Sequence, residues 1–131
     1  MSSPDEEPRV NAWLGPPGQI SPLHTDPYDN MLCQVHGLKY VTLFSPEDDE
    51  LLCPFDSINQ ANTSQIIDPR GAEAERRWPT LAQAKPLSAI LEPGDVLYMP
   101  KKWWHFVLAD PQTDFSASVN FWWLSQPLDS A

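Results

Sequence analysis

Two histidines and one aspartate are the residues of this chain whose types and spacing could do chemistry. His24 and Asp26 are separated only by Thr25, and His105 follows far downstream in an aromatic run. Residues i and i+2 of an extended segment point to the same side, so His24 and Asp26 could grip one ion together. Two imidazoles and a carboxylate form the facial triad that holds non-haem Fe(II) with coordination positions left open. The tripeptide alone is weak evidence for a metal site, so the sequence on either side of it must support the interpretation.

The elements that must position these residues are short extended segments. β-Branched and aromatic runs alternate with Pro and Gly turn signals, a pattern typical of an all-β sandwich or barrel. Ser45-Pro46 indicates a helix start, a helical turn is predicted at residues 73–77, and the polar stretch 57–85 is predicted to be a long insertion. The predicted strands are residues 10–14, 30–36, 39–44, 87–91, 96–99, 105–108 and 115–123.

Strand parity puts polar side chains on faces that should be interior. Lys39 shares its face with Val41 and Leu43. A lone buried ammonium costs on the order of several kcal/mol, so either a buried anion pairs with it or the side chain snorkels to solvent at the strand end. In the last strand, Asn120 and Trp122 share the face expected to look into the barrel. Asn120 there could bond a ligand or be a satisfied core amide.

Composition limits the partners. Eight basic and 18 acidic residues give a formal net charge of −10. This balance disfavours nucleic acid and anionic membrane surfaces and favours cationic partners such as Arg- or Lys-rich peptides, although acidity can also serve solubility alone. The two cysteines lack metal-site spacing and are interpreted as reduced thiols of a nuclear or cytoplasmic protein. No apolar run is long enough to predict a membrane span.

Several stretches occur in a recognisable order. They are residues 10–15 (VNAWLG), 21–27 (SPLHTDP), 34–40 (QVHGLKY), 91–100 (LEPGDVLYMP), the run Trp103-Trp104-His105, and residues 115–123. Together they resemble a Jumonji-C (JmjC) domain, most closely its arginyl hydroxylase type, which has also been described as a lysine demethylase. The resemblance covers about residues 10–123, nearly the whole chain.

The resemblance implies a fold and a chemistry. The fold is a double-stranded β-helix, the cupin-like jelly roll. The activity is that of an oxygenase that depends on Fe(II) and 2-oxoglutarate, with His24, Asp26 and His105 as the metal ligands at the catalytic centre. Lys39 would bind the far carboxylate of 2-oxoglutarate.

It also implies roles for residues that have simpler explanations. Asn30 would hold the metal-proximal end of 2-oxoglutarate, unless it is a plain turn residue, and Ser21 and Asn120 would add contacts to this co-substrate. Trp13 matches a position that lines the substrate pocket, where an indole can stack on a guanidinium; core packing would equally explain it. Trp122 is the second substrate-binding candidate.

The departure from the family lies at the N-terminus, where strands that precede residue 10 in JmjC proteins are expected to be missing. We expect a disordered acidic start (1–9), a partial JmjC/cupin-like domain (10–124) and a tail (125–131). Three functions follow: an oxygenase that hydroxylates a side chain of a basic protein or peptide, a catalytically weak fragment acting as a binding module or partner subunit, and a histone lysine demethylase. Uncovered edges would favour self-association.

Overall fold

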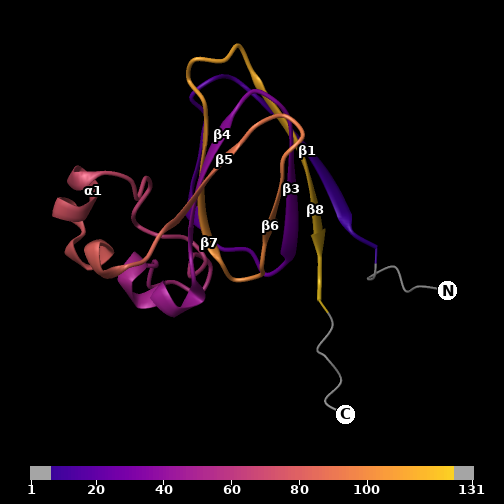
Figure 1. Ribbon diagram of the computed structural model, residues 1–131. Coiled ribbons are helices and arrows are strands. Elements are labelled where there is room, and N and C mark those ends of the chain that lie inside the picture. The colour runs from indigo at the N-terminus through magenta and orange to yellow at the C-terminus, as the bar shows by residue number, and fades with distance from the viewer. Residues whose placement is uncertain (1–6, 126–131) are drawn as a thin grey trace.

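The computed structural model describes residues 7–125, which form two four-stranded antiparallel sheets (Figure 1). Sheet A has the order β1-β8-β3-β6, and sheet B has the order β2-β7-β4-β5. This arrangement confirms the predicted all-β, cupin-like double-stranded β-helix. The strands of sheet A are β1 (Arg9–Gly15), β8 (Ser116–Trp123), β3 (Asp29–His36) and β6 (Val96–Met99); those of sheet B are β2 (Ile20–His24), β7 (Trp104–Ala109), β4 (Lys39–Phe44) and β5 (Leu87–Leu91).

Every predicted strand recurs within two residues of its expected bounds, but β2 was not predicted. Its sequence, ISPLH, contains Pro22, which weakens a strand pattern because proline cannot donate to a ladder. β2 is an edge strand of sheet B, where a proline is tolerated. The pairing of β2 with β7 also shifts between Ser21 and His24, so the segment lacks regular alternation.

The space between the sheets is apolar at its centre. Val41 and Leu43, which share a face with Lys39, lie there and are 1% and 7% exposed. The cluster is completed by residues of both sheets, namely Leu32, Leu91, Met99 and Val107. The parity prediction for strand β4 is therefore confirmed, and Lys39 faces the same interior.

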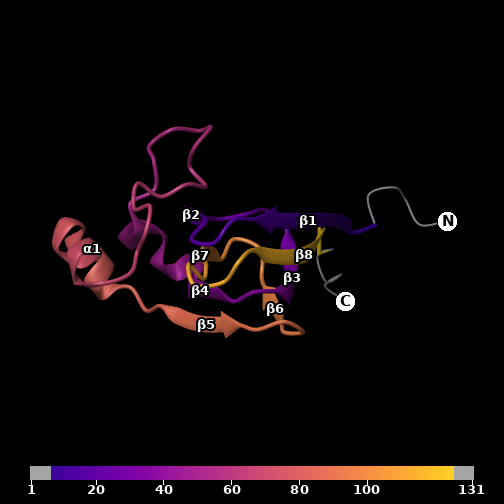
Figure 2. The ribbon, with the colours of Figure 1, turned by 90° about the horizontal axis from the view of Figure 1, so that it is seen from above.

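The outer face of β2, β7 and β4 is covered by the long connection between β4 and β5. This connection holds the 3-10 helices η1 (Pro46–Leu52) and η2 (Pro79–Gln83) and the short helix α1 (Ala72–Arg77), which Figures 1 and 2 show beside sheet B. Ser45 caps η1 by accepting from Glu47 N at 3.2 Å, as its position predicted. The covered cluster consists of Leu23, Phe44, Leu52, Ile66, Leu81, Ala84, Trp104 and Phe106.

The outer face of sheet A lacks such a cover within the described residues. Its outward positions are apolar and follow the strand registers, for example Val10 opposite Phe121 and Phe121 opposite Met31. The exposed apolar residues of this bare face are Val10, Leu14, Met31, Val35, Val96, Tyr98 and Phe121. β1, its edge strand, pairs only with β8 among the strands described.

Two sequence expectations concern the chain ends. The disordered start and the tail fall largely on residues 1–6 and 126–131, which lie outside the described part. Arg9 already belongs to β1, one residue before the strand start that we predicted. Within the described residues, no helix is long and apolar enough to cross a membrane.

Candidate metal centre

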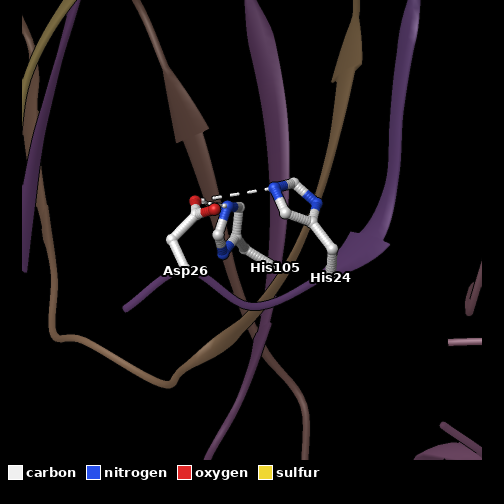
Figure 3. A group of neighbouring side chains, drawn as sticks. All are labelled: His24, Asp26 and His105. Atoms are coloured by element: carbon white, nitrogen blue, oxygen red, sulfur yellow. Dashed lines mark ion pairs between the residues drawn. The ribbon is translucent and has the colours of Figure 1, made fainter. Parts of the chain in front are cut away.

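Neighbouring strands bring the two distant histidines side by side. His24 at the end of β2 is the Cα partner of His105 on β7, and their ring centroids are 4.2 Å apart. Asp26 follows β2 directly, and its Oδ2 lies 3.3 Å from Nε2 of His105 and 3.6 Å from Nε2 of His24. Figure 3 shows the three side chains pointing toward one another. The structure thus brings together the three residues singled out from the sequence.

Hydrogen bonds orient both imidazoles in the same way. Nδ1 of His24 lies 2.7 Å from the carbonyl oxygen of Pro22, and Nδ1 of His105 lies 3.1 Å from that of Trp103. A carbonyl oxygen only accepts, so each Nδ1 carries the proton and each Nε2 of a neutral ring offers a lone pair. This is the arrangement in which a backbone carbonyl fixes the tautomer of a metal-ligating histidine.

The spacing and chemistry of this donor set fit one small divalent cation. The three ligand atoms lie within 4.8 Å of one another. Ligands bound at about 2.0–2.2 Å and roughly at right angles are about 3 Å apart, close to the distances seen here. Two imidazole lone pairs and a carboxylate repel at this range unless a proton or a cation lies between them. A set of two nitrogens and one oxygen on one side of an ion is the facial triad that suits Fe(II).

The electrostatics of the cluster favour a cation. Burial alone would raise the pKa of the Asp26 carboxyl. When no cation is bound and the rings carry a second proton, hydrogen bonds from His105 and His24 and the charges of those rings hold that pKa well below its usual range. Burial alone would lower the pKa of the His24 ring, yet the Asp26 carboxylate and the Pro22 carbonyl outweigh burial and raise it. The anion at the centre of the cluster therefore stays ionised and attracts positive charge.

The backbone of the His-Thr-Asp motif is held from two directions. Thr25 N donates to the Asn62 carbonyl at 2.8 Å, and the Asn62 amide donates back to the Thr25 carbonyl at 3.1 Å. From the other side, Lys102 N donates to the Asp26 carbonyl at 2.9 Å. These bonds fix Asp26, which lies beyond the last residue of β2 and has no strand ladder to hold it.

A bulge in β2 decides which residues face the interior. Ser21 pairs with Val107 and His24 pairs with His105, so three steps along β2 match two along β7. Regular alternation would place Ser21 and His24 on opposite faces. With the bulge, both line the same cavity.

The cavity between the sheets has a volume of about 220 Å³ and contains all nine sequence-predicted site residues. They are Trp13, Ser21, His24, Asp26, Asn30, Lys39, His105, Asn120 and Trp122. Residues that sequence reasoning did not single out also line it, among them the apolar side chains of Leu32, Met99, Val107 and Ala109. The alternation His105-Val107-Ala109 along β7 was the signal that could have identified two of them.

Among the described residues, Lys39 is a cation without an anionic partner. Its Nζ donates to Ser118 Oγ at 2.6 Å, across the gap between the two sheets. Burial lowers the pKa of the Lys39 ammonium, and no carboxylate within the described part of the chain counteracts this effect. The parity argument left a buried anion and a snorkelling side chain open, and the inward position favours the anion.

Two further candidates, Asn30 and Asn120, contact each other directly, and a third, Trp122, has an aromatic neighbour. Asn120 donates to Asn30 Oδ1 at 3.0 Å, and both side chains are almost fully buried. Trp122 stacks on Tyr28 with ring centroids 5.5 Å apart. Tyr28 was not predicted, because nothing in the local pattern marks a residue after Pro27 as a neighbour of the cavity wall. His36, the remaining histidine, lies outside the cavity and bonds Asp114 at 2.8 Å.

Comparison with known proteins agrees with this picture. Residues 2–129 match the cupin-like domain family. A protein of Xenopus tropicalis named lysine-specific demethylase 8 is 44% identical over 119 residues, which cover 91% of this chain and 26% of that protein. The human bifunctional peptidase and (3S)-lysyl hydroxylase JMJD7 is 29% identical, covering 87% of this chain and 41% of that protein. The chain thus spans only a quarter to two fifths of these relatives.

Among solved structures, the ribosomal oxygenase YcfD from Escherichia coli superposes with a TM-score of 0.57 at 19% identity, over 96% of this chain and 26% of that chain. This likeness shows the fold alone. The family match and the names of the relatives confirm the resemblance inferred from the sequence. The chain therefore belongs to the cupin-like domain family and is a JmjC-type member of it.

Proposed function

We propose that this chain carries the catalytic centre of an Fe(II)- and 2-oxoglutarate-dependent oxygenase that hydroxylates a protein side chain, as an arginyl hydroxylase does. One observation supports this most strongly. A single cavity is lined by a three-residue donor set for a divalent metal and by Lys39, a lysine that has no anionic partner among the described residues. A ligand that chelates a metal at one end and carries a carboxylate at the other satisfies both.

Each residue has a distinct part in this proposal. His24, Asp26 and His105 hold one face of the metal, and Lys39 pairs with the far carboxylate of 2-oxoglutarate. The apolar wall of Leu32, Met99 and Val107 excludes water from the reacting centre. The bound metal would supply dioxygen activation, coupled to oxidation of 2-oxoglutarate to succinate and CO₂. One oxygen atom enters succinate and the other becomes the hydroxyl of the product, which balances the reaction.

The proposed substrate is a basic protein or peptide. The acidic chain attracts cations, and the aromatic rings of Trp13, Tyr28 and Trp122 lie at or beside the cavity. A guanidinium stacked on such a ring gains roughly 0.5–2 kcal/mol. Substrates of this kind agree with the nuclear or cytoplasmic location expected from the cysteines.

Lysine demethylation is the second candidate, and the name of the Xenopus relative favours it. Hydroxylation of an N-methyl group uses the same oxidising chemistry, because the hydroxymethyl product releases formaldehyde. The two activities differ only in which C–H bond the substrate presents. A chain that binds metal and 2-oxoglutarate without turning over either peptide would be the binding module or partner subunit considered above.

The test supplies the purified chain with Fe(II), 2-oxoglutarate and one of two peptides, containing arginine or trimethyl-lysine. Hydroxylation adds the mass of one oxygen atom to the arginine peptide, whereas demethylation removes a methyl group and yields formaldehyde. Succinate formation reports turnover of the co-substrate in both cases. Absence of 2-oxoglutarate-dependent succinate with every peptide would contradict the enzymatic proposal for this chain.

A matched control separates the metal site from general damage. His105→Ala should abolish binding of one Fe(II) and all succinate formation. His36→Ala removes a histidine that also bonds an aspartate, but outside the cavity, and should change neither. Loss of metal binding in both variants would place the metal elsewhere or reveal unfolding, which circular dichroism distinguishes.

A further inference from the structure

Three cavity side chains form a chain of hydrogen bonds along sheet A. The indole Nε1 of Trp13 donates to Asn120 Oδ1 at 2.7 Å, and Asn120 Nδ2 donates to Asn30 Oδ1 at 3.0 Å. Asn120 and Asn30 are 2% and 6% exposed, whereas Trp13 is 50% exposed. This series of hydrogen bonds therefore runs from the open rim of the cavity to its buried wall.

The register of sheet A explains why these residues meet. Asn120 lies on β8, which is paired with β1 on one side and with β3 on the other. Trp13 pairs with Ser118 and Asn30 pairs with Trp122, so both are diagonal neighbours of Asn120. Long side chains reach such diagonal partners on the same face.

The indole of Trp13 fixes the donor-to-acceptor order of the whole series of hydrogen bonds. An indole N–H can only donate, so Asn120 must turn its oxygen toward Trp13. The Asn120 amide nitrogen then points at Asn30, and Asn30 must accept this hydrogen bond with its own side-chain oxygen. The Asn30 NH₂ group is what remains, and no described residue accepts from it. Because Asn30 lines the cavity, this group is a donor available to a ligand.

We propose that Trp13 is a positioning residue that sets the amide of Asn30 so that the cavity presents a donor, selecting a ligand with an acceptor such as a carboxylate. The identity of that ligand as 2-oxoglutarate rests on the function proposed above. Without the indole donor, Asn120 and Asn30 can both reverse. Asn30 would then turn its oxygen toward the carboxylate, and the two acceptors would repel.

This role differs from that of a substrate platform. A ring that only stacks on the peptide changes peptide affinity and leaves the co-substrate untouched. A ring that fixes the amide changes co-substrate affinity in the absence of any peptide. Trp13→Phe retains an aromatic ring and removes the donor, so it separates the two roles.

The binding experiment titrates 2-oxoglutarate into the Zn(II)-loaded chain by calorimetry, without peptide. Trp13→Phe should raise Kd about threefold to tenfold, the effect of one net hydrogen bond, and leave the Kd for Zn(II) unchanged. Trp123→Phe is the matched control, because Trp123 lies on the outward face of the neighbouring strand β8 and stacks on Tyr98. It should leave both constants unchanged. An unaltered 2-oxoglutarate Kd in Trp13→Phe would overturn the proposal.

A second measurement tests the chain of bonds without any ligand. In ¹⁵N-labelled metal-free protein, the Trp13 indole proton should exchange slowly with solvent, and Trp13→Phe should shift the side-chain amide signals of Asn30. Unshifted Asn30 signals would overturn the proposal. If the wild-type chain binds no 2-oxoglutarate, the proposed function fails at that point, and the Asn30 signals still decide whether Trp13 sets the amide.

Discussion

The two sheets have outer faces of similar apolar character and different surroundings. The outer face of sheet B packs against the β4–β5 connection, where Phe106 and Leu52 are fully buried. The outer face of sheet A leaves Leu14 78% exposed and Phe121 36% exposed. A face of this kind is uncommon on a soluble monomer and is typical of contact surfaces.

The difference divides the cavity into two halves. The half that holds the candidate metal ligands belongs to sheet B. The segment that covers this sheet also bonds β2 and the His-Thr-Asp motif through residues 62–67. The half that holds Trp13 belongs to β1, an edge strand of the bare sheet. We infer that metal binding depends on contacts present within the described residues, whereas positioning of a peptide depends on what meets sheet A.

Truncation of one phenylalanine on each outer face gives the largest contrast. Phe106→Ala should lower the free energy of unfolding by about 3–5 kcal/mol, because a filled core position becomes a cavity. Phe121→Ala should lower it by about 1 kcal/mol or less. Urea unfolding followed by tryptophan fluorescence measures both. Equal losses would mean that sheet A is covered in solution.

Lys39 lies between the sheets, and replacing it should affect ligand binding and stability in opposite directions. Lys39→Met removes the charge that would pair with 2-oxoglutarate and should raise its Kd about tenfold to a hundredfold, while the metal Kd stays the same. The free energy of unfolding should rise by up to about 1 kcal/mol, because a desolvated ammonium is replaced by an apolar group. Calorimetry and urea unfolding check the two parts. A less stable variant would show that the Lys39–Ser118 bond matters more for the fold than desolvation.

Self-association is the expected consequence of the bare face. Leu14→Lys places a charge on β1 and should weaken any dimer about tenfold or more, because the ammonium would have to be desolvated. Ile90→Lys is the control, since Ile90 is similarly exposed, at 60%, on the edge strand of sheet B. Sedimentation velocity across a concentration series gives the dimer constant. A monomeric wild-type chain would end this prediction.

The smallest effect concerns a polar contact at the rim of the bare sheet. Asp29 accepts from the Tyr98 hydroxyl at 2.9 Å and from Lys101 N at 3.2 Å. Burial alone would raise the pKa of the Asp29 carboxyl, but these bonds and the one from Ser125 lower it. A depressed folded-state pKa stabilises above the unfolded-state pKa, and the benefit disappears as pH falls through the folded value.

Asp29→Asn should therefore cost about 1 kcal/mol at neutral pH and less in acid. Urea unfolding between neutral pH and about pH 3 compares the two proteins. Parallel stability curves for wild type and variant over this range would show that the carboxylate charge is not what the contact uses.

Local sequence patterns predicted much of this molecule. Alternation placed Lys39 with Val41 and Leu43, and the order of motifs singled out His24, Asp26 and His105 before any contact was known. The β2 bulge could not be predicted, because a shift in pairing depends on the partner strand. The bonds joining Trp13, Asn120 and Asn30 depend on the register of three strands that are far apart in sequence. The cover over sheet B also needed three-dimensional packing, since its polar sequence shows little periodicity.

The bonds between Asn62 and Thr25 couple two equilibria. Any opening of the β4–β5 connection that pulls Asn62 away also releases the backbone between His24 and Asp26. By linkage, a metal that binds only the closed form must in turn stabilise the connection, by an amount that grows with metal concentration. The segment that shields sheet B thus becomes a reporter of the metal: its resistance to proteolysis should rise when the three ligands are occupied.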